Sequence, residues 1–557
     1  MGIHGMALPK LPFAVSFVFF LGWITATSSA QIIGPPGGGI IGKWPTPATP
    51  VGNPPDPQKA LLGKALFWDE QLSGDRSMAC GSCHAPAFGG NDANGGALHP
   101  GTDGLFGSVD DLFGSPGVIR QNSLKEYIHD ANFGSKRQVT PLNAPTQIGA
   151  AFFSQLFWDR RAGPDLKDEF GVTVPGFAVN AALEDLVTGP PTSPVEMGHD
   201  GILWSAIASK ISGLEPLALA TNIPPDLQTL LGSTYQQLFL QAFGPVIVPG
   251  ATVSRERIAR AIAQYMRTQI PDQAPIDSGV LSISLSAQRG LNLFRSTGCV
   301  SCHSVNGLAV NPGGKFIDSN DNLFSDGAIH GIGLSHVSAV PVKTPTLRNV
   351  ALRKRLFSTG QAQNLKDALQ QQYFVQNPPL GFGGPLPPQD NADLGAFFDS
   401  LTDPRVANEL PPFDRPTLRA ESVPFQSNQF GSGSAGTGGF IPTMISNAPE
   451  KIGNADFKMG LGSSLGGSSA IFGVSRGANP GQVLNGIPIE IDLTQLAIFT
   501  SLPLTAGGSG QGTATFFLGL PNSVTLIGIP IFTQWFVADP ASAGGFAASP
   551  AAGYTIF

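Results

Sequence analysis

The feature that most constrains this chain is a five-residue motif that occurs twice. Residues 80–84 have the sequence CGSCH, and residues 299–303 have the sequence CVSCH. Two cysteines separated by two residues and followed at once by histidine are typical of covalent c-type haem attachment, in which the thiols form thioethers and the imidazole binds the iron. The motifs use all four cysteines of the chain. The sequence therefore predicts two covalently bound haem c groups, with attachment and proximal-ligand residues Cys80, Cys83, His84, Cys299, Cys302 and His303.

Other uses of paired cysteines fit this pattern less well. The two pairs in a zinc site normally lie within tens of residues of each other, whereas these two are about 200 residues apart. A structural disulfide or a redox-active dithiol gives no reason for a histidine to follow both pairs. Haem attachment is the interpretation that accounts for the cysteine and histidine spacing that both motifs share.

Length and charge bound the remaining possibilities. A chain of 557 residues predicts several domains. The net charge is −7 with only 13% charged residues, so the chain has no basic surface for nucleic acid, and we expect no nucleic-acid partner. The 70 glycines and 49 prolines predict long loops and linkers.

The N-terminal 30 residues have the layout of a secretory signal peptide. Lys10 precedes an apolar run over residues 11–24, and the small residues 28–30 follow as a cleavage site. The apolar run is short for a membrane span, although an uncleaved anchor stays open. Residues 31–55 are rich in glycine and proline and predict a flexible linker. We therefore expect a periplasmic or secreted protein.

A repeat relates the two motif regions. GKALF at residues 63–67 precedes the first motif and GLNLF at 290–294 precedes the second, while PT at 145–146 and LF at 156–157 recur at 345–346 and 356–357. The PT and LF pairs share one offset of 200 residues, and the glycine phrases recur in the same order at a somewhat larger spacing, which indicates internal duplication. We predict a mainly α fold with two c-type-cytochrome-like haem domains, residues 56–253 and 254–405.

Two helices are marked by their own sequence signals. Asp56 and Pro57 form an N-cap and first turn that predict a short helix through about Trp68. A second, amphipathic helix starts at Ser254, with an apolar stripe at Ile258, Ala261, Ile262, Tyr265 and Met266. This stripe predicts a helix that packs in a domain core.

The chain changes character after residue 405. Residues 406–454 are rich in proline, serine and glycine and predict a linker. Residues 455–557 alternate β-rich runs with turn residues, with runs at 470–474, 487–499, 513–518 and 524–537. That pattern predicts a C-terminal all-β, sandwich-like module. It has no cysteine or histidine, so we expect it to serve attachment or stabilisation.

Four further phrases carry a family resemblance. They are NAPT at 143–146, FWD at 157–159, PVEMG at 194–198 and TPTLRNV at 344–350. Together with the two haem motifs, over roughly residues 56–405, they resemble the bacterial di-haem cytochrome c peroxidase family, which includes the related methylamine-dehydrogenase-maturing di-haem enzymes. The resemblance implies a peroxidatic first haem and an electron-transferring second haem.

The resemblance also implies roles for individual residues. Glu196 matches the family's acid–base glutamate above the peroxidatic iron, and Trp158 matches the tryptophan between the haems, where core packing is the alternative. The family's second polar residue falls on Glu169 when it is counted forward from Trp158, but on Leu186 when it is counted back from Glu196, and both options stay open.

Further ligands are implied with less agreement between sequence and family. His99, in a glycine-rich loop, matches the removable distal ligand of the first haem, although a surface histidine fits equally well. Tyr373 is the expected sixth ligand of the second haem, with His330 and His336 as alternatives. Asn143 with two backbone carbonyls would hold one calcium ion, but the three cations at 353–355 beside that site weigh against it.

The expected activity follows from the resemblance. It implies a secreted di-haem c-type peroxidase that reduces hydrogen peroxide to water. The electrons would come from a small redox protein, a c-type cytochrome or cupredoxin, enter at the second haem and pass by Trp158 to the first. The alternatives are a di-haem oxidase that acts on a protein or organic substrate through high-valent iron, and a non-catalytic electron-transfer cytochrome. A homodimer is one expected assembly.

Overall fold

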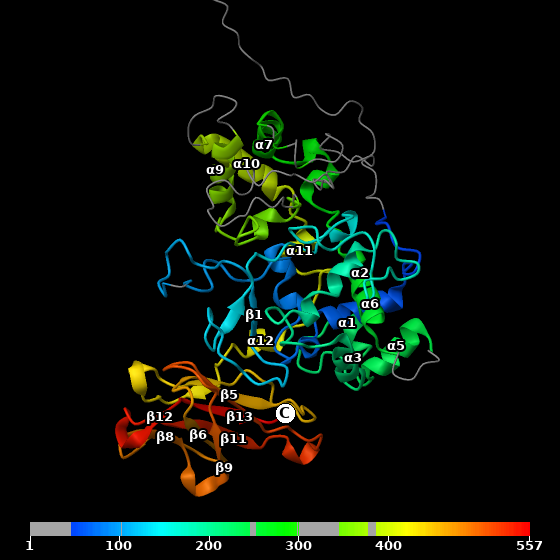
Figure 1. The fold of residues 1–557 in the computed structure, drawn as a ribbon. Coiled ribbons are helices and arrows are strands. Elements are labelled where there is room, and N and C mark those ends of the chain that lie inside the picture. The colour runs from blue at the N-terminus through cyan, green and yellow to red at the C-terminus, as the bar shows by residue number, and fades with distance from the viewer. Residues whose placement is uncertain are drawn as a thin grey trace, which may run out of the picture. The chain divides into compact units, whose positions relative to one another are not determined.

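The computed structural model describes residues 46–101, 103–245, 252–297, 299, 303, 343, 345–376 and 386–557. Residues Ile41–Phe557 form one compact unit, whose elements are labelled in Figure 1. The predicted signal peptide and most of the linker that follows it lie outside the described residues. Among the described residues, no helix is long and apolar enough to span a bilayer.

The chain is less helical than we expected. Of the described residues, 29% lie in helices and 19% in strands, so the prediction of a mainly α fold overstates the helix content. The haem region owes this to its long loops and short 3-10 turns, which follow from its glycine and proline content. The expected C-terminal β-sheet region is present.

The first helix pair begins where the sequence predicts. Helix α1 (Pro57–Phe67) is capped by Asp56, whose carboxylate accepts hydrogen bonds from the N–H groups of Gln58 at 2.9 Å and Lys59 at 3.1 Å. Helix α6 (Arg255–Thr268) buries its whole predicted apolar stripe. The two helices cross so closely that a Cβ on Gly63 would lie 1.9 Å from the carbonyl oxygen of Ala261. Glycine is therefore required at that crossing.

A second helix pair repeats this arrangement. Helix α7 (Leu285–Ser296) packs on α10 (Pro388–Asp399), and a Cβ on Gly290 would lie 1.9 Å from the carbonyl oxygen of Asp393. The glycines of the phrases GKALF and GLNLF thus have the same structural role. Each pair forms the centre of a separate hydrophobic cluster of the haem region.

The loops that lie in the chain between the two helices of each pair also correspond. Phe157 and Phe357 both adopt positive φ, at 64° and 66°. Each is preceded by a leucine that bridges to an alanine six residues on, Leu156 to Ala162 and Leu356 to Ala362. Positive φ is rare for a bulky residue, so two such turns 200 residues apart indicate one local structure used twice.

The remaining elements of the haem region are short. A two-stranded hairpin pairs β1 (Pro116–Ile119) with β2 (Arg137–Val139). The other helices are α2 (Ala182–Val187), α3 (Trp204–Ser212), α4 (Pro225–Gln228), α5 (Tyr235–Phe243), α9 (Leu365–Gln376), α11 (Pro404–Ala407) and α12 (Arg419–Ser422).

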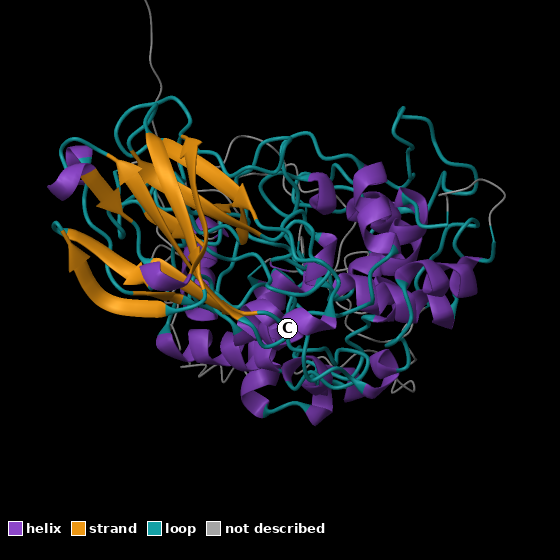
Figure 2. Cartoon of the chain, turned by 90° about the horizontal axis from the view of Figure 1, so that it is seen from below, coloured by secondary structure: helices purple, strands orange, loops and turns teal. Residues whose placement is uncertain are grey.

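The C-terminal region contains two main antiparallel sheets and a hairpin (Figure 2). One sheet has the order β10-β5-β4, the other the order β3-β13-β11-β6-β9 with β12 beside β11, and β7 pairs β8. The two main sheets share one hydrophobic cluster, to which the first contributes Met459 and the second Phe472 and Trp535. The strands are β3 (Gln429–Phe430), β4 (Thr443–Ile445), β5 (Lys458–Ser464), β6 (Ser469–Ser475), β7 (Ala478–Leu484), β8 (Ile487–Ile491), β9 (Leu496–Pro503), β10 (Gly512–Phe517), β11 (Pro530–Ala538), β12 (Phe546–Ala548) and β13 (Ala551–Thr555).

The predicted β-rich runs locate only some of these strands. They coincide with β6, β8, β9, β10 and most of β11, but residues 524–526, expected to be extended, form a 3-10 turn. Strands β3 and β4 lie in the segment 406–454 that was expected to be a linker. That segment also buries Phe413 and Leu418 completely or almost so.

The β-region is joined to the haem region by buried polar contacts. The Tyr127 hydroxyl donates to Asn447 Oδ1 at 2.9 Å, and its backbone N–H donates to the Thr515 hydroxyl at 2.8 Å. The Lys458 ammonium, which is buried, donates to the side chain of Gln121 and to the carbonyl of Lys125. These contacts fix the loop over residues 120–135 of the haem region against β5 and β10.

Candidate functional site

One cavity collects most of the site residues expected from the sequence. Its lining includes Cys80, Cys83 and His84 of the first motif, together with Trp158 and Glu196. These residues are up to 116 positions apart in the chain, so only the tertiary structure brings them together. Most of the other lining side chains are apolar, as expected for a site that encloses a porphyrin ring.

His84 is oriented as a ligand. Its Nδ1 lies 3.1 Å from the carbonyl oxygen of Gly90, so a proton on Nδ1 can be donated there and Nε2 is left for a metal. Burial lowers the pKa of His84, which favours the neutral, ligand-competent imidazole. The Phe67 ring of helix α1 lies 6.4 Å from the His84 ring, centroid to centroid.

The two thiols lie beside this imidazole on one short turn. The 3-10 helix over Cys80–Ser82 places both cysteines along the same cavity, and Cys83 Sγ lies 3.5 Å from the carbonyl oxygen of Pro116. Burial raises the pKa of both thiols. Among the described residues, no cluster of three or more His, Cys, Asp and Glu side chains suits a bare metal ion. Two thiols and an imidazole placed along one cavity fit a covalently attached haem.

Glu196 is held over this cavity by the β1–β2 hairpin. The Val118 N–H donates to the carbonyl of Val195 at 3.0 Å, and the Gln138 side-chain amide donates to the carbonyl of Pro194 at 2.8 Å. A Cβ on Gly117 would lie 1.8 Å from the Val195 carbonyl oxygen, so this close approach requires glycine. Burial raises the pKa of Glu196, and the positive charge of Arg161 partly opposes this effect. A carboxyl with a raised pKa can both accept and return a proton.

The structure separates the two options for a second polar residue. Leu186 lines the cavity with Glu196, whereas Glu169 is exposed and lies outside the lining. Of the two options, the residue that lines the cavity in this chain is thus the apolar Leu186. Arg161 lines the cavity and lies over the Phe157 ring at 3.7 Å, a contact that the sequence did not suggest.

His99 is not among the described residues that line this cavity. Its ring packs edge-on against Phe133 at 4.9 Å, and its Nδ1 accepts a hydrogen bond from the N–H of Gly101 at 3.2 Å. The backbone N–H of His99 donates to the carbonyl of Leu112, and the N–H of Leu112 donates to the carbonyl of His99. The residue is only 9% exposed. In this conformation His99 serves as a packed loop residue.

A second cavity surrounds Cys299 and His303. The Phe294 ring lies 6.5 Å from the His303 ring, which matches the distance between Phe67 and His84 in the first cavity. Cys302, His330 and His336 lie outside the described residues. Position 373 falls in helix α9, one turn after Leu369, which lines the cavity, but the Tyr373 side chain is outside the described part of the structure.

The two cavities share a wall. Trp158, Pro345 and the segment 143–146 line both of them. Trp158 is 7% exposed, and its indole N–H donates to the carbonyl of Asn143 at 2.7 Å. The ring is therefore fixed in the partition between the two predicted haem sites.

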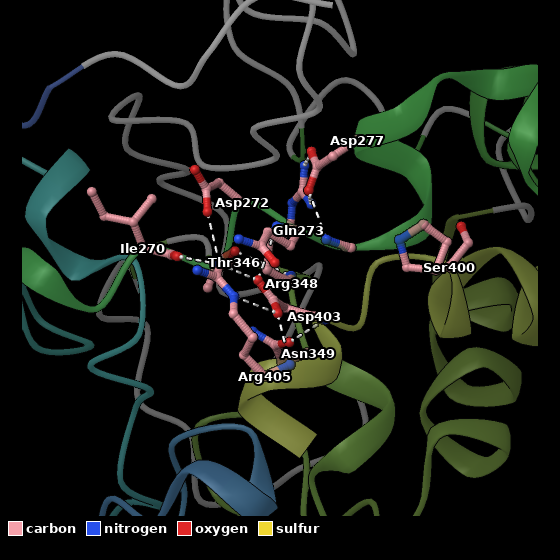
Figure 3. Close-up of polar contacts among 12 residues, drawn as sticks. Ile270, Asp272, Gln273, Asp277, Thr346, Arg348, Asn349, Ser400, Asp403 and Arg405 are labelled. Atoms are coloured by element: carbon pink, nitrogen blue, oxygen red, sulfur yellow. Dashed lines mark hydrogen bonds and ion pairs between the residues drawn. The ribbon is translucent and has the colours of Figure 1, made fainter. Parts of the chain in front are cut away.

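An extended polar network supports this wall from the second haem region (Figure 3). The Arg348 guanidinium, 2% exposed, forms two 2.9 Å bonds to the carboxylate of Asp277. Asn349 accepts a bond from the N–H of Asp403 at 2.9 Å, and the Asp403 carboxylate is bound by Arg405. The network fixes the turn at residues 345–349, which borders both cavities.

Asn143 fits the calcium site that the resemblance implies. Its side-chain nitrogen lies 3.2 Å from the carbonyl oxygen of Arg355, and its Oδ1 is buried with no hydrogen-bond partner among the described residues. An amide oxygen and backbone carbonyls are the hard ligands that calcium prefers. The neighbouring cationic head groups are directed elsewhere: Arg353 binds the carbonyls of Thr346 and Arg348, and Lys354 lies 4.7 Å over the Phe88 ring.

Comparison with known proteins agrees with this geometry. Residues 57–282 match the family model of the di-haem cytochrome c peroxidases, and residues 287–402 match that of cytochrome c. The chain is 27% identical to a cytochrome c peroxidase of Escherichia coli K12 over 64% of its own length and 61% of that protein. It is 28% identical to the cytochrome c551 peroxidase of Pseudomonas aeruginosa over 65% of its own length and 84% of that protein. It is 26% identical to the methylamine utilization protein MauG of Methylophilus methylotrophus over 58% of its own length and 73% of that protein.

Proposed function

Because the haem region of this chain belongs to the di-haem cytochrome c peroxidase family, we propose that the protein is an oxidoreductase that reduces hydrogen peroxide to water. The observation that carries this proposal is the first cavity, where the haem-attachment residues, Glu196 and Trp158 meet. The overall reaction consumes one peroxide, two electrons and two protons and releases two waters. The bound haem would supply the iron centre at which peroxide is reduced.

The protein's own part in that reaction is proton transfer at Glu196. Cleavage of the O–O bond is easier when the proton of one peroxide oxygen is moved to the departing oxygen. A carboxylate that lines the cavity can accept the first proton and return it to the leaving oxygen, which then departs as water. The raised pKa of Glu196 suits both halves of this transfer.

Electrons would reach the first site through the shared wall. A small donor protein, a c-type cytochrome or a cupredoxin, would reduce the group at His303, and Trp158 would relay the electron to the group at His84. The position of Trp158 between both cavities supports this path. Its fixed orientation, through the bond to Asn143, gives the relay one geometry.

The position of His99 bears on how the first site is controlled. His99 is held against Phe133 and Leu112 and is not among the described residues that line the first cavity. For His99 to cap the iron, its backbone would have to leave Leu112. We therefore propose that His99 would have to move with the glycine-rich loop at residues 95–101 before it could bind the iron, and that the first site can react with peroxide without prior removal of His99.

A second function is favoured by one group of relatives. The similarity to MauG of Methylophilus methylotrophus suits a di-haem oxidase that acts on a protein or organic substrate. Tyr373 in helix α9 would ligate the second haem in either function. A peroxidase would turn over with only peroxide and a small redox donor. The oxidase would also need its protein or organic substrate.

Other features of the proposal follow from the sequence. We propose that the two haem regions, expected from the sequence at residues 56–253 and 254–405, arose by duplication, which the paired glycine crossings and the paired turns at Phe157 and Phe357 support. Because helix α6 packs on α1 within the first hydrophobic cluster, we propose that the first region extends through Thr268. We further propose periplasmic or secreted location, one calcium ion at Asn143, and the C-terminal β-region as a stabilising module. Two covalent haem c groups are the essential cofactors.

The decisive experiment is spectroscopy of the haem-loaded full chain. Absorption and electron spin resonance would be recorded on the oxidised and half-reduced protein, with and without peroxide, and turnover would be measured with a c-type cytochrome or a cupredoxin as donor. We expect two haems, an open first haem and donor-dependent peroxide consumption. Two inert six-coordinate haems would support the electron-carrier alternative, and reaction with peroxide without donor turnover would support the oxidase.

A further inference from the structure

A buried ion pair connects the two haem sites. Asp92 follows the first haem motif, Arg355 follows the turn at residues 345–349, and each is 2% exposed. The Arg355 Nη2 donates to Asp92 Oδ2 at 2.5 Å, and its Nη1 donates to the carbonyls of Phe113 and Gly114 at 2.5 and 2.6 Å. All the partners of this guanidinium thus come from the first haem region. Burying two charges is costly, so the pair calls for a functional explanation.

The two ends of the pair face different haem sites. Arg355 is one of the residues that line the second cavity. Asp92 directly follows Gly90 and Asn91, whose carbonyls accept bonds from His84 Nδ1 at 3.1 Å and from the Ala85 N–H at 3.0 Å. The carboxylate therefore follows the segment that orients the proximal histidine of the first site, and it binds Ser115, which lines the first cavity, although Asp92 itself is not among the described lining residues. Burial, and to a lesser extent the negative charge of Asp92, raises the pKa of Cys83.

The pair also joins the shared wall. Asp92 accepts a bond from the Ser115 hydroxyl at 2.6 Å, and Ser115 accepts one from the Ala144 N–H at 3.2 Å. The carbonyl of Arg355 accepts from the Asn143 side chain at 3.2 Å. The wall that carries Trp158 is therefore tied to both charges.

A charge beside a haem shifts the balance between its oxidation states. A negative group stabilises the more positive, oxidised iron, and a positive group stabilises the reduced iron, most strongly where water is excluded. A carboxylate beside the first site and a guanidinium along the second therefore act in opposite directions. Their combined effect favours an electron on the second haem.

We propose that the Asp92–Arg355 pair sets the difference in reduction potential between the two haems, so that the first electron from the donor stays on the second haem. This inference rests on the two-haem assignment but not on peroxide turnover. It gives the enzyme a stored electron at the site from which Trp158 can pass it on. Arg355 and Asp92 are in this sense positioning residues, because they act on the haems without touching the substrate.

The test is a stepwise reductive titration of the haem-loaded full chain, followed by absorption in the presence of redox mediators. Arg355→Met removes the positive charge at similar length and leaves Asp92, so the second haem should be reduced at a lower potential than in wild type. Asp92→Asn leaves Arg355 uncompensated, so the second haem should be reduced at a higher potential, and the first haem, which loses its nearby negative charge, should rise by more. The difference between the two potentials should therefore narrow in both variants. Arg355→Lys keeps the charge and should lie close to wild type.

The opposite directions of the two shifts in second-haem potential distinguish this proposal from a merely structural role of the pair. A general loosening of the fold would shift the second haem in the same direction in both single variants. Arg267→Met is the matched control, because Arg267 forms an equally buried pair with Glu184 at 2.7 Å and lines neither haem cavity. Shifts of the same sign, or shifts no larger than that of Arg267→Met, would overturn the proposal. If Arg355→Met does not load haem, Asp92→Asn decides alone, since no upward shift would then refute it.

Discussion

The substitution Glu196→Gln tests the proton transfer most directly. It keeps the size and hydrogen-bonding capacity of the side chain but removes the group that accepts the proton of peroxide. Positioned acid–base groups contribute about 10²–10⁴-fold to a reaction rate. Glu196 is the one carboxylate among the described residues that line the first cavity, so no other described carboxylate there can replace it. We therefore expect a loss near the upper end, ~10³–10⁴-fold, which corresponds to about 4–5 kcal/mol of activation free energy.

The pH dependence sharpens this expectation. Burial raises the pKa of Glu196, and only the deprotonated form can accept a proton. In wild type, kcat/KM for peroxide should therefore fall as the pH drops through that raised pKa. In Glu196→Gln, kcat/KM should not show this fall at low pH (the acidic limb of the profile), since glutamine does not titrate.

The assay is steady-state peroxide reduction with a small redox donor, measured across pH on protein of verified haem content. Glu169→Gln is the matched control, because it makes the same chemical change at an exposed position outside the cavity. Reduction of the second haem by the donor should be unchanged in both variants. If Glu196→Gln keeps peroxide turnover within about tenfold of wild type, or retains the acidic limb, another group performs the proton transfer.

Three further predictions concern other parts of the molecule. Intact mass of the mature protein should show two covalent haems, and titratable thiols would contradict the assignment of both motifs. Trp158→Phe removes the N–H donor to Asn143 at 2.7 Å, so stopped-flow transfer between the haems should slow while both haem spectra stay unchanged; equal rates would make Trp158 a packing residue only. Tyr127→Phe removes the hydrogen bond to Asn447 at 2.9 Å, which should lower the free energy of unfolding by about 1–3 kcal/mol. It should also speed hydrogen exchange over residues 120–135. Unchanged exchange there would show that the β-region does not restrain this loop.

The sequence was sufficient for features that depend on neighbouring residues. The haem motifs are complete within five residues, and the caps at Asp56 and Ser254 with their following apolar periodicity located helices α1 and α6. The phrases GKALF and GLNLF could be recognised as a repeat from their letters alone, whereas the helix crossings that require their glycines were seen only in the fold. Local chemistry and short-range geometry explain all of these predictions.

Only the tertiary structure could decide features that depend on residues far apart in the chain. Whether Glu169 or Leu186 accompanies Glu196 depended on the length of an insertion, which residue counting cannot place, and the fold puts Leu186 in the cavity. His99 has the expected spacing, yet its packing on Phe133 directs it elsewhere. From the sequence, the cations at 353–355 weighed against a calcium site. The fold shows that the head groups of Arg353 and Lys354 have other partners.

Arg355 shows the reason most clearly. Its sequence neighbours indicate only a positive charge near a predicted calcium ligand, while its actual partners are an acid 263 positions away and two carbonyls. A guanidinium can satisfy its donors at any distance along the chain, so its role is set by the packing of the two haem regions and not by its local sequence. The types of chemistry were encoded locally; the arrangement of the charges around that chemistry was settled by the fold.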